Sequence, residues 1–363
     1  MSMEKDFECL SGALLVPAAA ATLLAASLVL LPGAAVLLAC AAGLIGAVIA
    51  AVHHAEVVAH RVGEPFGTLV LAVAITVIEV ALIVSMMLAG GPDKAALPRD
   101  TVFSAVMIIS SGVVGICLLV GGLRHHEQSF RVEGASSGLA ALVALATLSL
   151  VLPSFTTSSP GGTYTPSQLA FAAVASLALW LLFVFVQTVR HRDYFLPATG
   201  TADENTHAPP PPAGQAWASF GLLLVSLVSV VGLAKVLSPA IESAVAAAGA
   251  PKAVIGIAIA LLVLLPETWA AVRAARADRL QTSLNLALGS ALASIGLTIP
   301  AVALASVLLD LPLVLGLAPK DMVMLALSFG VSTLTLATGR TNVMQGGVHL
   351  VIFAAFLFLA LAP

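Results

Sequence analysis

The sequence predicts an all-α integral membrane protein with eleven transmembrane helices, and two observations carry that prediction. Of the 363 residues, 60% are hydrophobic and only 9% are charged, whereas about a quarter of the residues in soluble domains are charged. Apolar stretches of about 18 residues or more also recur from end to end. Each is long enough to cross, as a helix, a hydrocarbon core about 30 Å thick.

The spans follow from where polar residues, prolines and glycines interrupt the apolar runs. The acidic start MSMEKDFE does not fit a cleavable signal peptide, so we expect the first span to remain in the protein. The first six spans are expected at about 12–31, 34–59, 66–90, 101–123, 135–153 and 167–190. The other five are expected at about 215–237, 251–273, 281–306, 319–338 and 341–361.

The long polar segment 191–214 contains a proline run and divides the chain into parts. Its composition favours a flexible cytoplasmic linker. We expect an N-terminal segment with the first helix at 1–33, a first five-helix repeat at 34–190 and a second at 215–363. An odd number of crossings inverts the second copy, so the prediction is one N-terminal helix plus two inverted repeats.

Lysine and arginine positions predict the orientation through the positive-inside rule. With the N-terminus inside, ten basic residues fall on the inner side: Lys5, Arg61, Arg124, Arg131, Arg190, Arg192, Arg273, Arg276, Arg279 and Arg340. Four fall on the outer side: Lys94, Arg99, Lys252 and Lys320. We therefore expect a cytoplasmic N-terminus and linker and an external C-terminus.

Two glutamates, Glu79 and Glu267, each lie about midway along an apolar run. A carboxylate at the bilayer centre costs about 3 kcal/mol or more on insertion scales, so it is usually retained for function. The two occupy matching depths in the third and eighth spans, which belong to opposite halves. Paired there, they would bind a divalent cation through hard oxygen ligands. In the empty site their mutual repulsion would raise a pKa, so that protons compete with the cation. The structural alternative is that each is protonated or paired and only holds helices together.

Glu56 is a further candidate, for a proton path, because it lies in AVHHAEVVAHR near the end of the second span. Glu56 and His60 are four residues apart and share a helix face. The alternative is that this segment caps the cytoplasmic end of the helix, and we favour it for the histidines. The spacing is too weak a signal for a fixed zinc site.

Small polar residues in the fourth and ninth spans are candidates for the cation path: Ser111, Asn285 and Ser290. Ser111 and Ser290 each lie ten residues before a helix-breaking position, Gly121 and Pro300. Such residues either supply oxygens to an ion or let helices approach closely, and close packing is the commoner role of a single serine.

Several function classes find no support. The net charge of −3 gives no basic surplus for nucleic acid. No P-loop, GxSxG, GxGxxG or cofactor motif occurs. The cysteines, Cys9, Cys40 and Cys117, are an odd number in mostly apolar surroundings, which predicts packing residues with no disulfide framework.

Four long segments resemble the bacterial calcium/proton antiporters of the ChaA type, within the cation/calcium exchanger superfamily. They are AEVVAHRVGEPFGTLVLAVAITVIEVALI, RDTVFSAVMII, FVFVQTVRHRDYF and VLLPETWAAVRAARADRLQTSLNLALGSALASIGLTIP. The resemblance implies eleven helices and cation/proton exchange through one glutamate in each alpha-repeat, here Glu79 and Glu267. It also implies an acid in the preceding span, matching Glu56.

One departure bears on the choice of ion. Many calcium exchangers place Gly-Asn three to four residues before each glutamate, where this chain has Ile75-Thr76 and Val263-Leu264. The Thr76 hydroxyl can replace one missing amide oxygen, whereas Leu264 offers only its backbone carbonyl.

We therefore expect a bacterial inner-membrane antiporter without a cofactor, which exports Ca²⁺ in exchange for H⁺. Na⁺ and K⁺ remain open as additional cargo or, in the main alternative, as the principal cargo. A passive channel is a further alternative, and an intramembrane protease is disfavoured because no Ser/His, Ser/Lys, paired-Asp or HExxH arrangement lies at membrane depth. The expected partners are the cargo ions and the lipid bilayer, and a homo-oligomer stays open.

Overall fold

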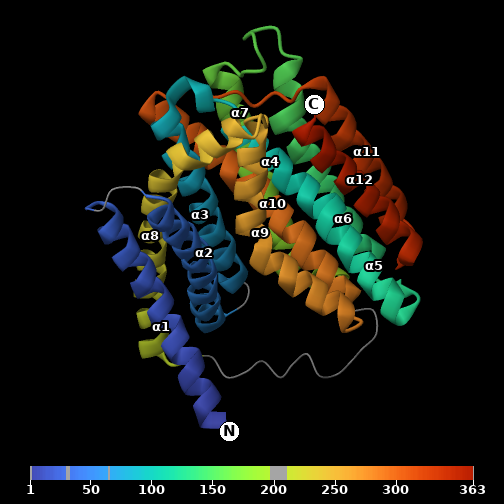
Figure 1. The fold of residues 1–363 in the computed structure, drawn as a ribbon. Coiled ribbons are helices and arrows are strands. Elements are labelled where there is room, and N and C mark those ends of the chain that lie inside the picture. Colours follow the sequence, from blue (N-terminus) through green and yellow to red (C-terminus); the bar gives the residue numbers. More distant parts are fainter. Residues whose placement is uncertain (1, 30–32, 64–65, 197–210, 363) are drawn as a thin grey trace. The chain divides into compact units, whose positions relative to one another are not determined.

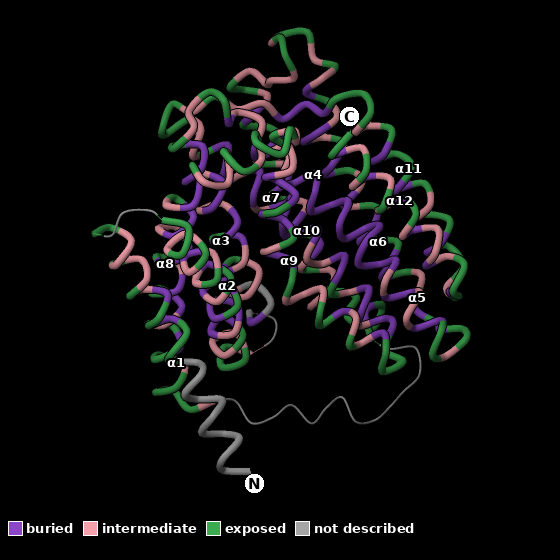
Figure 2. Tube along the Cα trace, in the orientation of Figure 1, coloured by how far each residue is buried: buried purple, intermediate pink, exposed green. Residues whose placement is uncertain are grey.

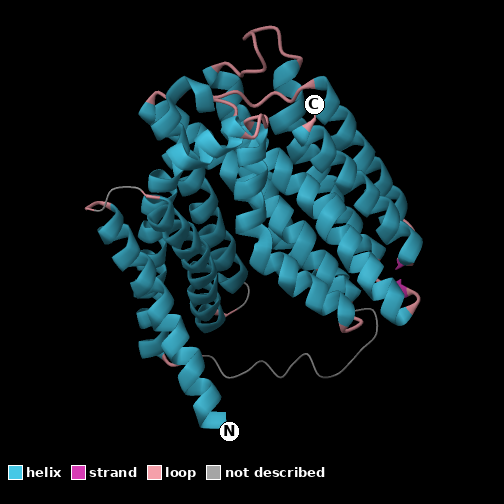
Figure 3. Cartoon of the chain, in the orientation of Figure 1, coloured by secondary structure: helices cyan, strands magenta, loops and turns pink. Residues whose placement is uncertain are grey.

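The computed structural model describes residues 2–29, 33–63, 66–196 and 211–362. This part of the chain is almost entirely helical (Figures 1 and 3). The first elements are α1 (Ser2–Ser27), α2 (Ala34–Val62), α3 (Phe66–Gly90), η1 (Gly91–Lys94), α4 (Leu97–Met107), η2 (Ile108–Val113), α5 (Val114–His125), β1 (Gln128–Ser129), α6 (Val132–Ala146), η3 (Thr147–Val151) and η4 (Leu152–Ser154). The remainder are α7 (Pro166–Phe185), η5 (Val186–Arg190), η6 (Arg192–Phe195), α8 (Ala213–Ala247), α9 (Ala253–Arg276), α10 (Leu280–Leu309), α11 (Pro319–Leu336), β2 (Arg340–Thr341) and α12 (Val343–Leu361).

The prediction of eleven helices is confirmed for the described residues, because α4, the π-helical turn η2 and α5 form one continuous span. Nine helical segments in this part of the chain are long and apolar enough to cross a membrane. The other two are α1 and α11. Exposed leucines, valines and phenylalanines on these helices are expected, since lipid tails are as apolar as the side chains they meet.

Some boundaries differ from the predicted ones. The seventh span was expected to end near residue 237, yet α8 continues to Ala247 with Pro239 inside it. A proline removes one backbone hydrogen bond, and membrane helices tolerate this loss where neighbours satisfy the freed carbonyl. The predicted linker 191–214 begins with the short turn η6, whose Phe195 is buried. Residues 197–210 of that linker lie outside the described residues.

The helices form two compact units. The first unit contains α1, α2, α3 and α8, with α2 packed against each of the other three. The second unit contains α4 to α7 and α9 to α12. Within it, α5 packs on α12 and α10 packs on α7. If the repeats run as expected, these are equivalent pairs, although the repeat boundaries themselves stay a prediction.

The α4–α5 span is the centre of the second unit. In its most apolar 18-residue window, 89% of residues are buried, against 28% for α7 and for α12. Figure 2 shows the buried positions running along α4. Glycines allow the close contacts there: a Cβ added to Gly256 of α9 would stand 2.8 Å from the Asp100 carbonyl carbon of α4. Small residues at such contacts let backbones approach, which stabilises helix pairs in a membrane.

Loops of the second unit meet at two ends. At one end, β1 and β2 form a two-stranded antiparallel ribbon, with Gln128 opposite Thr341. The Gln128 side chain also donates to the Ala275 carbonyl at the end of α9, over 3.0 Å. This end carries arginines that the sequence predicts to be cytoplasmic.

At the other end, the segment between α10 and α11 binds two earlier loops. Val314 N–H donates to the Ala95 carbonyl (2.9 Å), and Leu315 N–H donates to the Gly162 carbonyl (3.1 Å). Successive spans are predicted to cross the membrane in alternating directions. The loops found together at each end of the second unit are those that this prediction places on the same side of the membrane. Which end faces the cytoplasm stays a prediction.

The two cysteines with described side chains, Cys40 and Cys117, are buried and free. The side chain of Cys9 lies outside the described part of the structure.

Candidate functional site

Glu79 lies near the middle of α3, in the first unit, and only 2% of it is exposed. Thr76 lies three residues earlier, so it shares a face of the helix with Glu79. Thr76 is also buried, and its hydroxyl has no hydrogen-bond partner among the described residues. A buried hydroxyl normally has such a partner. α3 therefore carries a carboxylate and an unsatisfied oxygen on one buried face.

Glu56 lies on α2, which packs against α3 in the same unit. Its side chain is exposed, whereas the neighbouring His54 is buried. The rings of His53 and His54 meet edge to face, with centroids 5.4 Å apart. His60 and Arg61 occupy the last turn of α2, as expected of a helix end. A role for Glu56 in a proton path stays a prediction.

Glu267 lies in α9, in the second unit, and is half-buried. It directly follows Pro266, which is inside the helix. Because proline has no N–H, the carbonyl of Leu262 lacks its usual helical donor. α9 therefore has a carboxylate close in sequence to a backbone carbonyl oxygen that lacks its usual helical hydrogen bond.

Ser111 lies in the π-helical turn η2 and belongs to a buried chain of hydroxyls. Its Oγ is 2.8 Å from Ser328 Oγ of α11, and Ser328 Oγ is 2.8 Å from Ser110 Oγ. Ser110 in turn donates to the Val106 carbonyl over 2.7 Å. All three hydroxyls have partners in this arrangement. Sequence reasoning missed Ser328, although the Ser328, Ser332 and Thr335 stripe at helical spacing was a usable signal.

The two predicted residues of α10 differ in their surroundings. Both polar atoms of the Asn285 amide are engaged: Nδ2 donates to the Phe195 carbonyl (2.6 Å), and Oδ1 accepts from Gln281 (2.9 Å). The bond to Phe195 holds η6 against the start of α10, whereas the bond from Gln281 lies within α10. Ser290 is half-buried, and the stripe that it begins continues through Ser294 and Thr298, which are buried.

The structure thus places Glu56, Thr76 and Glu79 in the first unit and Ser111, Glu267, Asn285 and Ser290 in the second. Within the first unit, Thr76 and Glu79 share a helix. Within the second, Ser111 bonds to Ser328, and Asn285 bonds to Phe195 and Gln281, so these side-chain bonds do not join Ser111 and Asn285 to each other.

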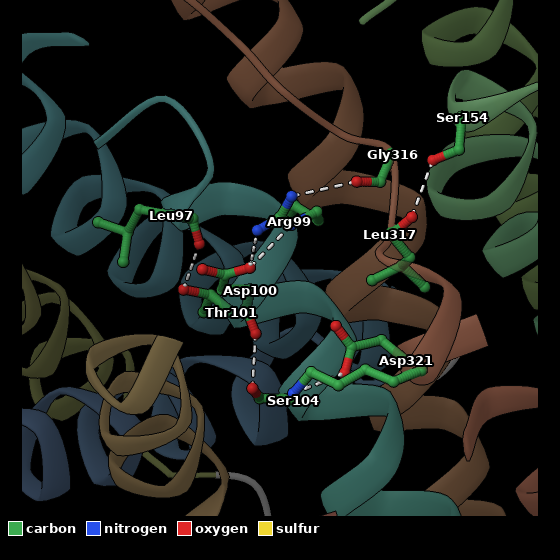
Figure 4. Close-up of polar contacts among 10 residues, drawn as sticks. Leu97, Arg99, Asp100, Thr101, Ser104, Ser154, Gly316, Leu317 and Asp321 are labelled. Atoms are coloured by element: carbon green, nitrogen blue, oxygen red, sulfur yellow. Dashed lines mark hydrogen bonds and ion pairs between the residues drawn. The ribbon is translucent and has the colours of Figure 1, made fainter. Parts of the chain in front are cut away.

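A polar cluster that sequence reasoning did not single out lies at the start of α4 (Figure 4). Arg99 Nη2 is 2.7 Å from Asp100 Oδ1, and Arg99 Nη1 donates to the Gly316 carbonyl over 3.1 Å. Nearby, Lys320 lies 3.7 Å from Asp321. The Arg99 guanidinium therefore joins α4 to the segment before α11. The adjacent charges in RDTV were the only sequence signal for it.

Comparison with known proteins gives a family. The model of the sodium/calcium exchanger protein family matches residues 32–189 and 218–362. The protein y4hA of Sinorhizobium fredii (strain NBRC 101917 / NGR234) is 52% identical over 324 residues, which cover 88% of this chain and 87% of that protein. The sodium-potassium/proton antiporter ChaA of Escherichia coli (strain K12) is 34% identical over 318 residues, which cover 87% of this chain and 86% of that protein.

The fold matches a solved exchanger as well. The crystal structure of the H⁺/Ca²⁺ exchanger CAX superposes with a TM-score of 0.72 at 13% identity, covering 98% of this chain and 88% of that one. These relatives are membrane transporters and not enzymes, in agreement with the sequence prediction. The family model and the 34% identical relative each cover most of the chain, so the chain belongs to the sodium/calcium exchanger protein family, within the cation/calcium exchanger superfamily.

Proposed function

We propose that this protein is a secondary transporter that exports Ca²⁺ from the cytoplasm in exchange for external protons. The observation that carries the proposal is a carboxylate near the middle of an apolar helix in each half of an exchanger-family chain, Glu79 in α3 and Glu267 in α9. Intramembrane acids of this kind mark ion paths.

In the proposed cycle, both carboxylates bind the same cation. Deprotonated, the pair carries two negative charges, which one Ca²⁺ neutralises through hard oxygen ligands. Without the cation, like-charge repulsion favours protonation, so protons displace the ion. The cation binds from the cytoplasm and leaves outside by alternating access, as expected for sites at the interface of inverted repeats. Thr76 and the Leu262 carbonyl are proposed to add oxygens.

The test uses proteoliposomes with an imposed pH gradient. Glu79→Gln and Glu267→Gln keep the shape of each side chain but remove the charge, and we expect each to reduce calcium-driven proton flux to the level of empty vesicles. Glu133→Gln is the matched control, because Glu133 is an exposed acid of α6. Exchange retained by either site variant, at normal protein levels, would refute the paired site.

A second candidate function is Na⁺ or K⁺/H⁺ antiport with little calcium transport. It is favoured by the 34% identical relative, which is named a sodium-potassium/proton antiporter, and by the missing Gly-Asn before each glutamate. Adding Ca²⁺, Na⁺ and K⁺ separately to the same proteoliposomes decides between them. Collapse of the pH gradient by Na⁺ or K⁺, but not by Ca²⁺, would select this candidate. Ion flux without proton movement would instead indicate a channel.

We place the protein in the bacterial inner membrane, with the N-terminus in the cytoplasm and the C-terminus outside. Support comes from basic residues in the second unit. Eight arginines lie toward the end that carries the β1–β2 ribbon, whereas Lys94, Arg99, Lys252 and Lys320 lie toward the other end. Positive charge is retained on the cytoplasmic side. A reporter fused to the C-terminus that is active only outside the cytoplasm tests the assignment.

A further inference from the structure

A basic groove lies between the ends of α5 and α9, within the second unit. Its cavity, of about 280 Å³, is lined by Arg124 of α5 and by Trp269, Arg273 and Arg276 of α9. An adjoining hollow of about 440 Å³ shares Arg124 and Arg276 with it. The helix ends are held together by a hydrogen bond between the His125 ring nitrogen Nε2 and the Arg276 carbonyl oxygen, 3.1 Å apart. We call this feature the arginine groove.

Among the described residues, the three guanidinium groups of the groove have no carboxylate that neutralises them: none forms an ion pair with Arg124, Arg273 or Arg276. The nearest acids along the chain have other partners. Glu127 lies 3.6 Å from Arg340, and Asp278 accepts a hydrogen bond of 2.8 Å from Gln128.

Helix ends alone do not balance this charge. Each C-terminus contributes about half a negative charge, so α5 and α9 together offset about one of the three positive charges. The positive-inside rule explains why arginines are on this side of the membrane. It does not explain why three of them line one cavity whose described lining residues include no acid. The charge of the groove is complementary to a phosphate group, which arginine binds through two parallel hydrogen bonds.

The rest of the groove is lined by apolar side chains, which a free anion would not contact. Trp269 is 71% exposed, and it lies seven residues before Arg276, which is about 10 Å along the helix. Val120 and Leu123 of α5 extend the apolar wall in the adjoining hollow. Tryptophan is enriched where a membrane meets water. An occupant with a charged head and an apolar body would contact both parts of the groove.

We propose that the arginine groove binds an anionic phospholipid, with its phosphate on Arg124, Arg273 and Arg276 and its glycerol and upper acyl chain along Trp269. Basic pockets between helices at a membrane surface are the usual form of such headgroup sites. The proposal concerns only residues of the second unit and does not depend on which cation is transported.

The test is lipid retention by the purified full chain, measured by native mass spectrometry after titration with phosphatidylglycerol or with phosphatidylcholine. We expect preferential retention of phosphatidylglycerol. In the triple variant Arg124→Gln/Arg273→Gln/Arg276→Gln, the affinity should fall by roughly 100-fold, because each basic residue near an anionic headgroup contributes about a factor of five. Arg192→Gln is the control, since Arg192 is an exposed arginine of η6 outside the groove.

Two further measurements keep the proposal falsifiable. Trp269→Ala retains all three arginines, and we expect it to weaken lipid retention severalfold while the melting temperature in phosphatidylcholine stays unchanged. Inorganic phosphate at millimolar concentration should not displace the lipid. Equal retention of both lipids, equal loss in the Arg192 control, or displacement by phosphate alone would each overturn the lipid assignment.

Discussion

Gly346 of α12 lies directly against Leu119 of α5: a Cβ on residue 346 would stand 2.8 Å from the Leu119 Cα and 3.0 Å from the Gly115 carbonyl oxygen. On the facing helix, a Cβ on Gly115 would stand 3.0 Å from the Cβ of His349. Each helix therefore presents a glycine to the other: Gly346 lies against the backbone of α5, and Gly115 lies against side-chain atoms of α12. These close contacts let α12 pack tightly on α5.

Gly346→Ala should destabilise the second unit by about 1–3 kcal/mol, because the added methyl group meets backbone atoms that cannot move aside. The measurement is the melting temperature in detergent, followed by size-exclusion chromatography after heating. Gly347→Ala is the matched control: the adjacent glycine has open space around its Cβ position and should melt like the parent protein. Equal melting of the two variants would show that α5 and α12 are not in close contact.

Arg99→Gln should also destabilise the protein, by about 1–3 kcal/mol, since it leaves the largely buried Asp100 carboxylate without its cation. The side chains of Arg99 and Asp100 are only 22% and 15% exposed. Lys252→Gln breaks a pair whose partners are 65% and 79% exposed, and it should have almost no effect. In a double-mutant cycle, Arg99→Gln/Asp100→Asn should recover part of the loss. Additive effects would contradict the pairing.

Ser328→Ala should lower the stability by about 1–2 kcal/mol, because Ser111 then loses its partner in a buried site. Ser332→Ala, one turn along α11, is the control, since Ser332 makes no hydroxyl hydrogen bond within the described residues. Stability is measured by thermal melting, and exchange is measured in proteoliposomes. If Ser111 instead served mainly as a cation ligand, Ser111→Ala would raise the KM for the cation without lowering the melting temperature.

Much of the fold could be predicted from the sequence because membrane helices are specified locally. Apolar length sets each span, and basic residues mark the loops at one end of the second unit. The errors arose where a local signal was overridden by packing. Pro239 suggested a helix end, but α8 continues through it. Phe195 looked like part of a flexible linker, yet it is buried and bonded to Asn285, 90 residues away.

The candidate site was predicted less completely for the same reason. Glu79 and Glu267 stand out because charge in an apolar run is visible locally. The polar stripe that contains Ser328 is also visible locally, but its hydrogen bond to Ser111 is not, because that bond depends on how α11 packs on η2. Asn285 was a candidate for the cation path, but its oxygen accepts a bond from Gln281, four residues earlier on the same helix, a spacing at which side chains do meet. Its bond to the Phe195 carbonyl could not be predicted locally, because it depends on how η6 packs on α10.

Pro266→Ala tests whether the backbone of α9 contributes to cation binding in the proposed site. Alanine restores an N–H that can donate to the Leu262 carbonyl, so this oxygen becomes less available to a cation. The helix itself should become more stable, since a proline inside a helix costs about 3 kcal/mol. We therefore expect a several-fold higher KM for the cation together with an equal or higher melting temperature. Pro300→Ala in α10 is the control for the general effect of removing a helical proline. An unchanged KM in Pro266→Ala would exclude the Leu262 carbonyl from the cation site, while Glu79→Gln and Glu267→Gln would still test the carboxylates independently.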